Sequence, residues 1–412
     1  MATSPKIAAA RIVVIMPNWL GDGVMATPFL RALRMRYPEG HIAAVTRPLV
    51  APVLAGLPFI NDLFVTKKGE ESAALQWLKQ NKFDLGVLLP NSFRSAWLLR
   101  RGGVKRRLGY AREWRSLLLT DQIAAKKWTR ENRLRVAKIE FAQWLVRYFI
   151  GRGKIISDAE LNEMTGKTGG KLSFWRRGYQ PVPTIEYYLK LAEYLGAPAE
   201  SDTRMDLGVT AAEREEAARV LAALGVADEP LVTIVPGANF GSSKCWPPER
   251  FAQLADRLID KQGEYRATVL LASSPAELPI VEAILGASML CPGGGGVGRL
   301  HALAKLNDGK GVSLGALKEI VRRSKMMICN DTGPRHFAAA FGIPCVTLFG
   351  PTDPVWAETW HPRERIVRID VPCGPCQLKK CPIDHRCMQG IEVEMVLSAA
   401  GELWGGSPTE GE

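Results

Sequence analysis

The sequence predicts an α/β protein built from two doubly wound domains, each a parallel sheet covered by helices. Its 412 residues exceed what one hydrophobic core usually organises. Both halves alternate short apolar runs with amphipathic stretches, which is the pattern of parallel sheets. With 47% hydrophobic and 23% charged residues, the composition is globular and excludes wholesale disorder or a fibrous repeat. We place one boundary between residues 205 and 206. Two doubly wound domains joined by one linker would place the loops at the carboxyl ends of their strands across a central cleft.

The N-terminal domain, residues 1–205, begins with a buried strand. Residues 11–16 form a β-branched run, and a glycine-containing loop leads from them to an amphipathic helix over 24–36 that stops before Pro38. The same alternation predicts strands at 41–46, 63–66 and 84–89 and helices at 71–80, 133–149 and 184–195.

The C-terminal domain, residues 206–412, repeats this order. A helix over 211–224 leads to a strand at 231–235. Further strands are predicted at 267–272, 325–329 and 344–349, with helices at 248–261, 314–323 and 334–341.

The sequence does not predict an integral membrane protein. No stretch reaches the roughly 18 uninterrupted apolar residues of a spanning helix, and the run from Ile7 to Met16 is broken by Arg11. That run also continues into Pro17 without a cleavage pattern of the A-x-A type. We therefore expect a reducing cytoplasm, where the eight cysteines are reactive or metal-binding before they are disulfide-bonded.

The net charge of +12 is concentrated in one segment. Between Arg94 and Lys138, fourteen Lys and Arg residues stand against three acidic residues. Such a segment attracts nucleic acid, an anionic membrane surface or an acidic substrate, or it is simply a solvated basic face. The segment has four Trp and Tyr residues and no recognised nucleic-acid motif, which argues against a nucleic-acid partner.

Asp22 is the candidate catalytic base. The first strand ends in Pro17-Asn-Trp-Leu-Gly-Asp22-Gly23, so we expect Asp22 in a loop facing the cleft, just before a helix. One interpretation is a helix N-cap, worth about 1 kcal/mol. The other is a general base whose carboxylate points at a reacting hydroxyl from a rigid sheet edge. Position alone does not choose between them.

The loop after the strand at 231–235 is a candidate anion site. Gly237 lets backbone amides approach an anion, Ser242 and Ser243 add hydroxyl donors, and Lys244 supplies a point charge suited to phosphate. An ordinary Gly/Ser surface loop is the alternative.

The segment Asn330–His336 joins a strand to a helix. Pro334 fits the first helical position and Gly333 leaves the helix start open, so amides would face a bound diphosphate. Asp331 would repel phosphate but accept hydrogen bonds from sugar hydroxyls. His336 either donates to phosphate or is a structural core histidine.

Glu277 follows the predicted strand at 267–272 and a Ser-Ser-Pro turn. An acidic residue in this place holds a ribose diol in dinucleotide-binding folds. A first-turn glutamate that favours the helix dipole is an equally good interpretation.

Together and in this order, the motifs resemble those of the lipopolysaccharide heptosyltransferases of glycosyltransferase family 9. The similarity covers most of the chain. The motifs on which the similarity rests are Pro17–Asp22 with Met25–Pro28, Leu89–Ser95, Pro236–Gly241 with Lys244 and Trp246–Pro247, Asn330–Pro334 with His336, and Leu348–Pro354.

The resemblance implies a GT-B fold and transfer of heptose from ADP-heptose to the first inner-core heptose of a Kdo-lipid A acceptor. The implied partners are ADP-heptose, an anionic lipid A-core acceptor and the cytoplasmic surface of the inner membrane, with no nucleic acid. We accordingly expect a cytoplasmic protein peripheral to that membrane, with the basic segment in the half that receives the acceptor.

The resemblance also assigns roles to matched positions. Asp22 is implied as the base, Lys244 as the diphosphate contact, Glu277 as the ribose contact and Asp331 as the donor-sugar contact. The donor-binding set further contains Gly237, Ser242, Ser243, Thr332, Gly333 and His336, and the acceptor-binding candidates are Asn18, Arg94 and Arg112.

The implied reaction is a single inverting displacement. Asp22 takes the proton of an acceptor hydroxyl as its oxygen attacks the anomeric carbon. Lys244 and the helix that begins near Pro334 stabilise the departing diphosphate. The sequence has no Asp-x-Asp pair, so we expect that catalysis requires no metal cofactor.

The segment from Cys373 to Cys387 holds four thiols. Cys373, Cys376, Cys381 and Cys387 are candidate ligands of a structural zinc ion, and reduced thiols or a disulfide pair are the alternatives.

Four other functions remain open. They are a family 9 transferase with another nucleotide-sugar or acceptor, a sugar-nucleotide epimerase of GT-B architecture, a nucleic-acid binder built on the basic segment, and a catalytically silent sugar-nucleotide-binding protein.

Overall fold

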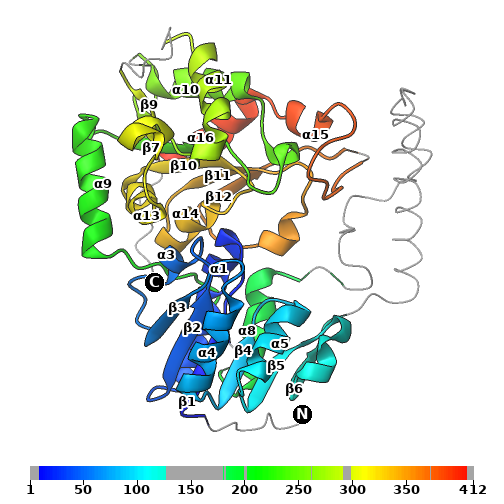
Figure 1. Ribbon diagram of the computed structural model, residues 1–412. Coiled ribbons are helices and arrows are strands. Elements are labelled where there is room, and N and C mark those ends of the chain that lie inside the picture. The colour runs from blue at the N-terminus through cyan, green and yellow to red at the C-terminus, as the bar shows by residue number, and fades with distance from the viewer. Residues whose placement is uncertain are drawn as a thin grey trace. The chain divides into compact units, whose positions relative to one another are not determined.

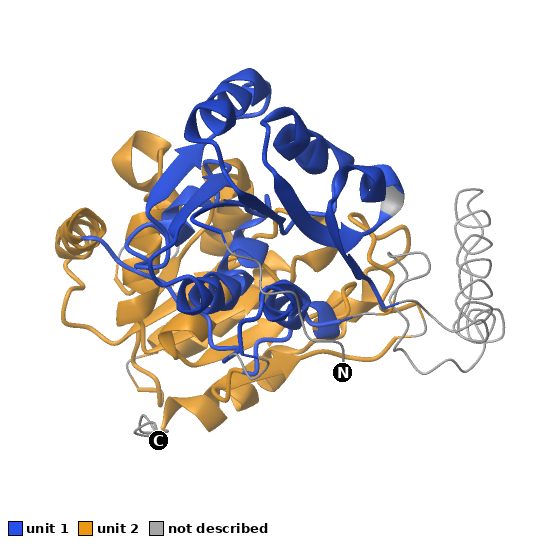
Figure 2. Cartoon of the chain, turned by 90° about the horizontal axis from the view of Figure 1, so that it is seen from below, with its two compact units in different colours: residues 1–126, 182–210, 355–360 blue, residues 127–181, 211–354, 361–412 orange. Residues whose placement is uncertain are grey.

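The structure is a computed structural model, which describes residues 9–126, 180, 182–198, 202–260, 262–290, 298–371 and 373–405. The chain divides into two compact units (Figure 2). Unit 1 comprises residues 1–126, 182–210 and 355–360, and unit 2 comprises residues 127–181, 211–354 and 361–412. From the sequence we placed one boundary and did not predict that residues 355–360 belong to unit 1. These residues contact α8 (Thr184–Tyr194), where the hydroxyl of Thr184 donates to the carbonyl of Trp356 at 2.7 Å.

Unit 1 is a six-stranded parallel sheet in the order β3-β2-β1-β4-β5-β6, with helices on both faces (Figure 1). The order reverses between β1 and β4, as in doubly wound folds. The elements are β1 (Arg11–Ile15), α1 (Leu20–Met25), α2 (Thr27–Arg36), β2 (His41–Thr46), α3 (Ala51–Leu54), β3 (Asp62–Val65), α4 (Glu71–Asn81), β4 (Leu85–Leu88), α5 (Phe93–Arg101), β5 (Arg106–Ala111), η1 (Glu113–Leu118), β6 (Asp121–Ala124) and α8 (Thr184–Tyr194).

The β-branched residues of β1 explain its central position. Alternate side chains point to opposite faces, and a strand buried on both faces is a continuous apolar run. Val13 and Ile15 pack with Leu78 of α4 and Leu99 of α5 on one face. The apolar pattern of β1 therefore places its carboxyl end in the middle of the sheet.

The predicted helix over 24–36 is two helices. α1 ends at Met25 and α2 begins at Thr27, with Pro28 in its first turn. The N-cap of α1 is Trp19, so Asp22 lies inside the helix as its third residue. The N-cap interpretation of Asp22 is wrong.

The basic segment contains two strands, β5 and β6, which the sequence analysis did not predict. Several of its cationic side chains form hydrogen bonds and ion pairs within unit 1. Arg107 donates to the carbonyls of Val104 and Leu118, and Arg106 pairs with the buried Asp121. The fully buried Arg115 donates to the carbonyls of Tyr110 and Pro90 and to the Asn91 amide oxygen. Much of the local charge is thus structural.

Arg115→Met is expected to lower the free energy of unfolding by about 3 kcal/mol, because it leaves buried carbonyls without donors. Denaturant unfolding measures this change. Arg100→Met is the matched control, since Arg100 is exposed on α5, and its effect should stay within about 0.5 kcal/mol. Equal stability of the two variants would contradict the structural role of Arg115.

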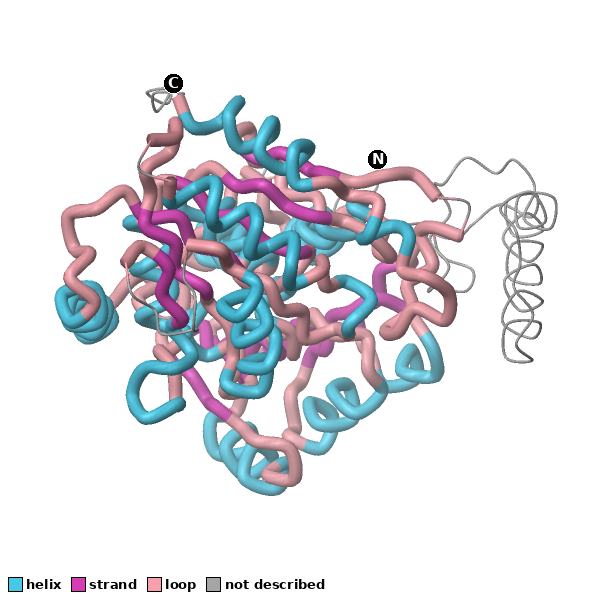
Figure 3. Tube along the Cα trace, turned by 90° about the horizontal axis from the view of Figure 1, so that it is seen from above, coloured by secondary structure: helices cyan, strands magenta, loops and turns pink. Residues whose placement is uncertain are grey.

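Unit 2 repeats the architecture with a parallel sheet in the order β12-β11-β10-β7-β8-β9, which reverses between β7 and β10. Strands alternate with helices along the chain (Figure 3). The elements are α9 (Ala211–Ala223), β7 (Leu231–Val235), η2 (Ser242–Lys244), α10 (Pro248–Ile259), β8 (Thr268–Leu271), η3 (Pro275–Glu277), α11 (Leu278–Ala287), β9 (Leu300–Ala302), η4 (Leu303–Lys305), α12 (Leu306–Gly309), α13 (Leu314–Arg323), β10 (Met326–Asn330), α14 (Arg335–Phe341), β11 (Cys345–Leu348), β12 (Glu364–Val367), α15 (Arg386–Gln389) and α16 (Val393–Trp404). Between β11 and β12, η5 (Pro354–Ala357) begins the return of the chain to unit 1.

The core of unit 2 lies between its sheet and α10, α11 and α16. Trp246, fully buried, stacks edge-on against Phe251, and its indole N–H donates to the carbonyl of Ile391 at 2.9 Å. The loop that follows β7 is therefore anchored in the core at Trp246, two residues after Lys244.

The α/β prediction and the alternation of strands and helices in both halves are confirmed. The predicted helix over 133–149 and the basic residues beyond 126 lie outside the described residues. In the part of the chain that the structure describes, no helix has both the length and the apolar character needed to cross a membrane.

Candidate functional site

The candidate residues lie at the carboxyl ends of the strands. Because all strands within each unit are parallel, the loops that follow them share one edge of each sheet. Ligands of doubly wound folds bind at this edge, where the strand order reverses. In unit 1 that position is flanked by the segments after β1 and β4, which hold Asp22 and Ser92. In unit 2 it is flanked by the segments after β7 and β10, which hold Lys244 and Asp331.

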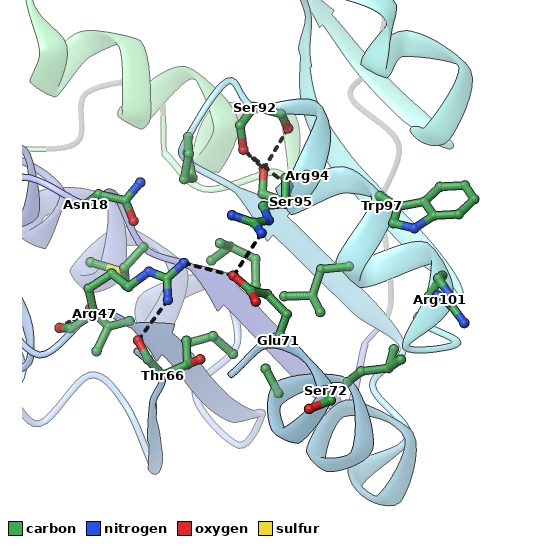
Figure 4. Close-up of a pocket in the computed structure, with 18 residues that line it drawn as sticks. Asn18, Arg47, Thr66, Glu71, Ser72, Ser92, Arg94, Ser95, Trp97 and Arg101 are labelled. Carbon is green, nitrogen blue, oxygen red and sulfur yellow. Dashed lines mark hydrogen bonds and ion pairs between the residues drawn. The ribbon is translucent and has the colours of Figure 1, made fainter. Parts of the chain in front are cut away.

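Unit 1 has a cavity of about 630 Å³ at this edge. It is lined by the ends of β1, β2 and β4 and by α4 and α5 (Figure 4). Ser92 begins α5 as its N-cap and accepts from the amide of Ser95 at 3.2 Å, which fixes how α5 leaves the cavity. The half-exposed Trp97 adds an aromatic face to the lining.

The cavity carries a cluster of charged groups. The Glu71 carboxylate lies between Arg47 and Arg94, at 3.7 and 3.3 Å from their guanidinium nitrogens (Figure 4). Arg47 also donates to the carbonyl of Thr66 at 3.0 Å. Backbone amide hydrogen bonds, helped by the two guanidiniums, lower the pKa of Glu71. Arg101 is also in the lining, so the cavity has three cations and one carboxylate and favours an anionic ligand.

The structure separates the three predicted acceptor residues. Asn18 and Arg94 both line the cavity (Figure 4). Arg112 is buried beside Tyr187 and is not part of this lining. Burial raises the pKa of Tyr187, and the neighbouring Arg112 opposes that rise. The contact of Arg112 with the tyrosine indicates a structural role.

Asp22 lies in the first turn of α1, which follows β1 at the point where the strand order reverses. Its side chain is partly exposed. Gly23 is buried, and a Cβ there would lie 2.5 Å from Cγ1 of Val50, so α1 packs closely enough to require glycine. This tight contact fixes the helix that carries Asp22.

In unit 2, Lys244 and Asp331 form a nearly buried ion pair. The Lys244 ammonium contacts Oδ2 of Asp331 and lies 3.2 Å from the Asp331 carbonyl oxygen. Thr352 donates to the same carboxylate oxygen at 2.6 Å. Burial pushes the pKa of Asp331 upward, but Lys244 and Arg335 outweigh it, so this pKa lies below its ordinary value. Asp331 is therefore ionised at neutral pH and repels a phosphate while accepting from hydroxyls.

Asn330 joins the two loops that hold this pair. Its side-chain amide donates to the carbonyl of Pro236 at 2.6 Å and accepts from the amide of Trp246 at 3.2 Å. Both partners flank the loop that carries Lys244, so the loops after β7 and β10 are connected through one buried side chain.

His336 is buried in the first turn of α14, close to Thr332 and Gly333 in sequence. Burial, assisted by the charge of Arg335, lowers its pKa to about 3. Its Nδ1 has no hydrogen-bond partner among the described residues. The imidazole is therefore neutral at physiological pH, and any contact with phosphate is a hydrogen bond without a positive charge.

Gly237 and Glu277 are in contact across two loops. A Cβ on Gly237 would lie 2.1 Å from Oε1 of Glu277, so only glycine leaves room for this carboxylate. Glu277 also forms a capping box with Ser274, whose amide and hydroxyl donate to Oε2 at 3.0 and 2.7 Å. The helix-start interpretation is thus correct in geometry, and the carboxylate still lies beside the glycine loop.

Ser242 and Ser243 differ in their surroundings. Ser242 is exposed. Ser243 is buried, and its hydroxyl donates to the carbonyl of Leu378 in the cysteine-containing segment. The structure thus uses the Ser243 hydroxyl internally, which is a different role from the predicted ligand contact.

The four cysteines at 373–387 are reduced in the structure. Burial raises the pKa of Cys373 to about 12, and the other three thiols add to the shift. Within the described residues, no group of three or more His, Cys, Asp or Glu side chains is placed to hold one metal ion. The zinc site stays a prediction.

Sequence reasoning missed several lining residues. Arg47 directly follows β2, so its place at the end of a predicted strand was a usable signal. Glu71 and Thr352 had no such signal, because their partners Arg94 and Asp331 are more than twenty residues away.

In unit 1 the polar segments at the carboxyl edge line a cationic cavity, and in unit 2 they hold a lysine–aspartate pair near a glycine loop. Two doubly wound units with polar carboxyl edges are the architecture of the GT-B class. The chain belongs to the family described as Glycosyltransferase family 9 (heptosyltransferase), whose sequence model matches residues 72–137 and 175–386.

Relatives and solved structures agree with this membership. Lipooligosaccharide heptosyltransferase 2 of Haemophilus influenzae is 25% identical over 402 residues, which cover 95% of this chain and 99% of the relative. Lipopolysaccharide heptosyltransferase 2 of Escherichia coli is 25% identical over 366 residues, covering 87% and 88%. The structure of E. coli ADP-heptose lps heptosyltransferase II superposes with a TM-score of 0.68 at 23% identity, covering 96% and 98%, which confirms the GT-B fold.

Proposed function

We propose that this family 9 glycosyltransferase transfers heptose from ADP-heptose to the inner-core heptose of a Kdo-lipid A acceptor in lipopolysaccharide core biosynthesis. The names of its relatives support the donor and the pathway. The observation that carries the proposal is the set of polar groups at the carboxyl edge of unit 2. There Lys244, Asp331 and Glu277 lie on loops of one sheet edge.

The donor occupies this edge of unit 2. Its diphosphate attracts the Lys244 ammonium away from Asp331, and the ionised Asp331 then accepts hydrogen bonds from the sugar hydroxyls. Glu277, beside Gly237, accepts from the ribose diol. Thr332, Gly333 and the neutral His336 contribute uncharged donors to the phosphates.

The acceptor occupies the cavity of unit 1. Arg47, Arg94 and Arg101 attract its anionic groups, and Trp97 offers a flat face to a sugar ring. An acceptor with a lipid anchor places the enzyme at the cytoplasmic surface of the inner membrane, as a peripheral protein.

Asp22 removes the proton of the attacking hydroxyl. The oxygen forms a bond to the anomeric carbon as the bond to the diphosphate breaks, which inverts that carbon in one step. ADP leaves as an anion stabilised by Lys244, so the reaction requires no metal cofactor. A structural zinc at Cys373, Cys376, Cys381 and Cys387 is a separate proposal, and metal analysis of the purified protein tests it.

Calorimetry with ADP-heptose, UDP-sugars and GDP-sugars tests the donor. Binding of ADP-heptose without binding of UDP-sugars or GDP-sugars supports the proposal. Preference for a uridine donor indicates another transferase. Release of ADP should depend on a Kdo-lipid A acceptor that carries one heptose. Turnover of the nucleotide-sugar without acceptor would instead identify a sugar-nucleotide epimerase.

Arg94→Met is expected to raise the acceptor KM about tenfold and to leave the donor KM unchanged, because one charge-assisted contact is lost. Steady-state kinetics with each substrate varied in turn measure both values. Arg100→Met, on the same helix but outside the cavity lining, should change neither. A rise in the donor KM alone would exclude the cavity as the acceptor site.

A further inference from the structure

The segment 373–387, here called the brace, packs against the loop that carries Lys244. The amide of Ser243 donates to the carbonyl of Lys379 at 3.2 Å, and the Ser243 hydroxyl donates to the carbonyl of Leu378. Nε2 of His385 lies 2.7 Å from the Ser243 carbonyl oxygen. Since a carbonyl only accepts, Nε2 carries the proton and donates. All three polar groups of Ser243 are therefore bonded to the brace.

The close fit extends to Gly241. A Cβ at this position would lie 2.2 Å from the carbonyl oxygen of Lys379, a distance that no side chain tolerates. Glycine is therefore required for the loop to lie against the brace, three residues before Lys244.

The brace also holds the loop on the other side of the ion pair. The amide of Gln377 donates to the carbonyl of Pro351 at 2.7 Å. A Cβ on Gly350 would lie 3.1 Å from Sγ of Cys387. Thr352, two residues after Gly350 in the same loop, donates to the Asp331 carboxylate. The brace thus contacts both loops whose side chains meet at the Asp331 carboxylate.

The brace is itself anchored in the fold. Cys387 and the adjacent Met388 are buried in the core of unit 2, at the end where α15 begins. His385 has a left-handed backbone conformation, with φ 57°, immediately before that helix. A residue held in this conformation by its surroundings presents its side chain in one direction.

We propose that the brace is a positioning element for the donor site, and that His385 is its positioning residue, acting on Lys244 through Ser243. This inference rests on the proposed function, because the position of Lys244 matters only if Lys244 binds the donor diphosphate. Lys244 follows Ser243 directly, so a shift of the Ser243 carbonyl moves the ammonium that meets the diphosphate. A small misplacement of a binding group has a large effect on transfer.

His385→Ala is expected to weaken ADP binding about tenfold and to raise the donor KM by the same factor, since it removes one partly buried hydrogen bond. The acceptor KM should not change. His385→Gln restores an N–H near the position of Nε2 and should recover binding to within about threefold. Ala and Gln both carry a Cβ in the left-handed conformation, so they share the same backbone cost.

His385→Asn protects the test against a folding defect. Asparagine tolerates the left-handed conformation better than alanine, but its side chain is too short to reach the Ser243 carbonyl. This variant should fold at least as well as His385→Ala and still bind ADP weakly. Asp384→Asn is the control, because it weakens the ion pair with Arg386 within the brace but leaves the Ser243 contacts intact.

ADP calorimetry, unfolding curves and two-substrate kinetics distinguish the outcomes. Selective loss of donor affinity in the Ala and Asn variants, with rescue by Gln, supports the proposal. Normal ADP binding by a folded His385→Ala or His385→Asn, or an equal rise of both KM values, overturns it while the proposed function stands. If the unaltered enzyme does not bind ADP, the proposed function fails, and the positioning role fails with it.

Discussion

Asp22→Asn is expected to lower kcat by about 10²- to 10⁴-fold, the range for loss of a general base. The amide has nearly the same shape as the carboxylate but does not take up a proton. The donor does not depend on this group for binding, so its dissociation constant should change less than about twofold. Single-turnover transfer and calorimetry with ADP-heptose measure the two quantities.

The matched control is Asp62→Asn. Asp62 is an exposed carboxylate at the start of β3, at the opposite end of its strand from the cavity edge, and its loss should leave kcat unchanged. Unchanged turnover in Asp22→Asn would refute the assignment of the base. Loss of donor binding together with turnover would indicate that Asp22 contributes to binding or to folding instead.

Lys244→Met is expected to reduce kcat/KM for the donor by about 10²- to 10³-fold, because the departing diphosphate loses its positive contact. The same change leaves the buried Asp331 carboxylate without its main counter-charge. The free energy of unfolding should therefore fall by about 3 kcal/mol at neutral pH. Donor kinetics and denaturant unfolding measure the two effects.

A double variant separates binding from stability. Lys244→Met combined with Asp331→Asn removes both charges, so stability should largely return while donor binding stays weak. Lys310→Met, at an exposed lysine of unit 2 outside the brace, is the control for loss of a cation. Full donor activity in the folded double variant would exclude Lys244 as the diphosphate contact.

The Asp331 carboxylate also gives a direction for the pH dependence of stability. Its pKa is lower in the folded protein than in the unfolded chain, so the ion pair stabilises the fold fully above the unfolded pKa. This contribution is lost as the pH falls through the lower, folded pKa. The double variant has no carboxylate at position 331, so its free energy of unfolding should not show this loss at low pH.

Much of the fold and part of the site were predictable from local sequence patterns. Short apolar runs predicted the central strands β1, β4, β7 and β10, because a strand buried on both faces must be apolar along its length. The strand β5 was missed because it begins with Arg106 and Arg107, and β6 was missed because it is short and begins with Asp121 and Gln122. The charges of the two arginines are satisfied by Asp121 and by backbone carbonyls, and these partners are visible only in the folded chain.

The same division holds for the site. Asp22, Lys244 and Asp331 were proposed because each lies in a polar segment that follows a buried strand, and parallel strands bring such segments to one edge. The sequence by itself thus determined which segments lie at the carboxyl edges of the two sheets and hold the candidate residues. Only the tertiary structure decided that Glu71 lies between two arginines and that His385 supports the Lys244 loop. These contacts join residues as many as 142 positions apart, and such pairings depend on packing and not on local periodicity.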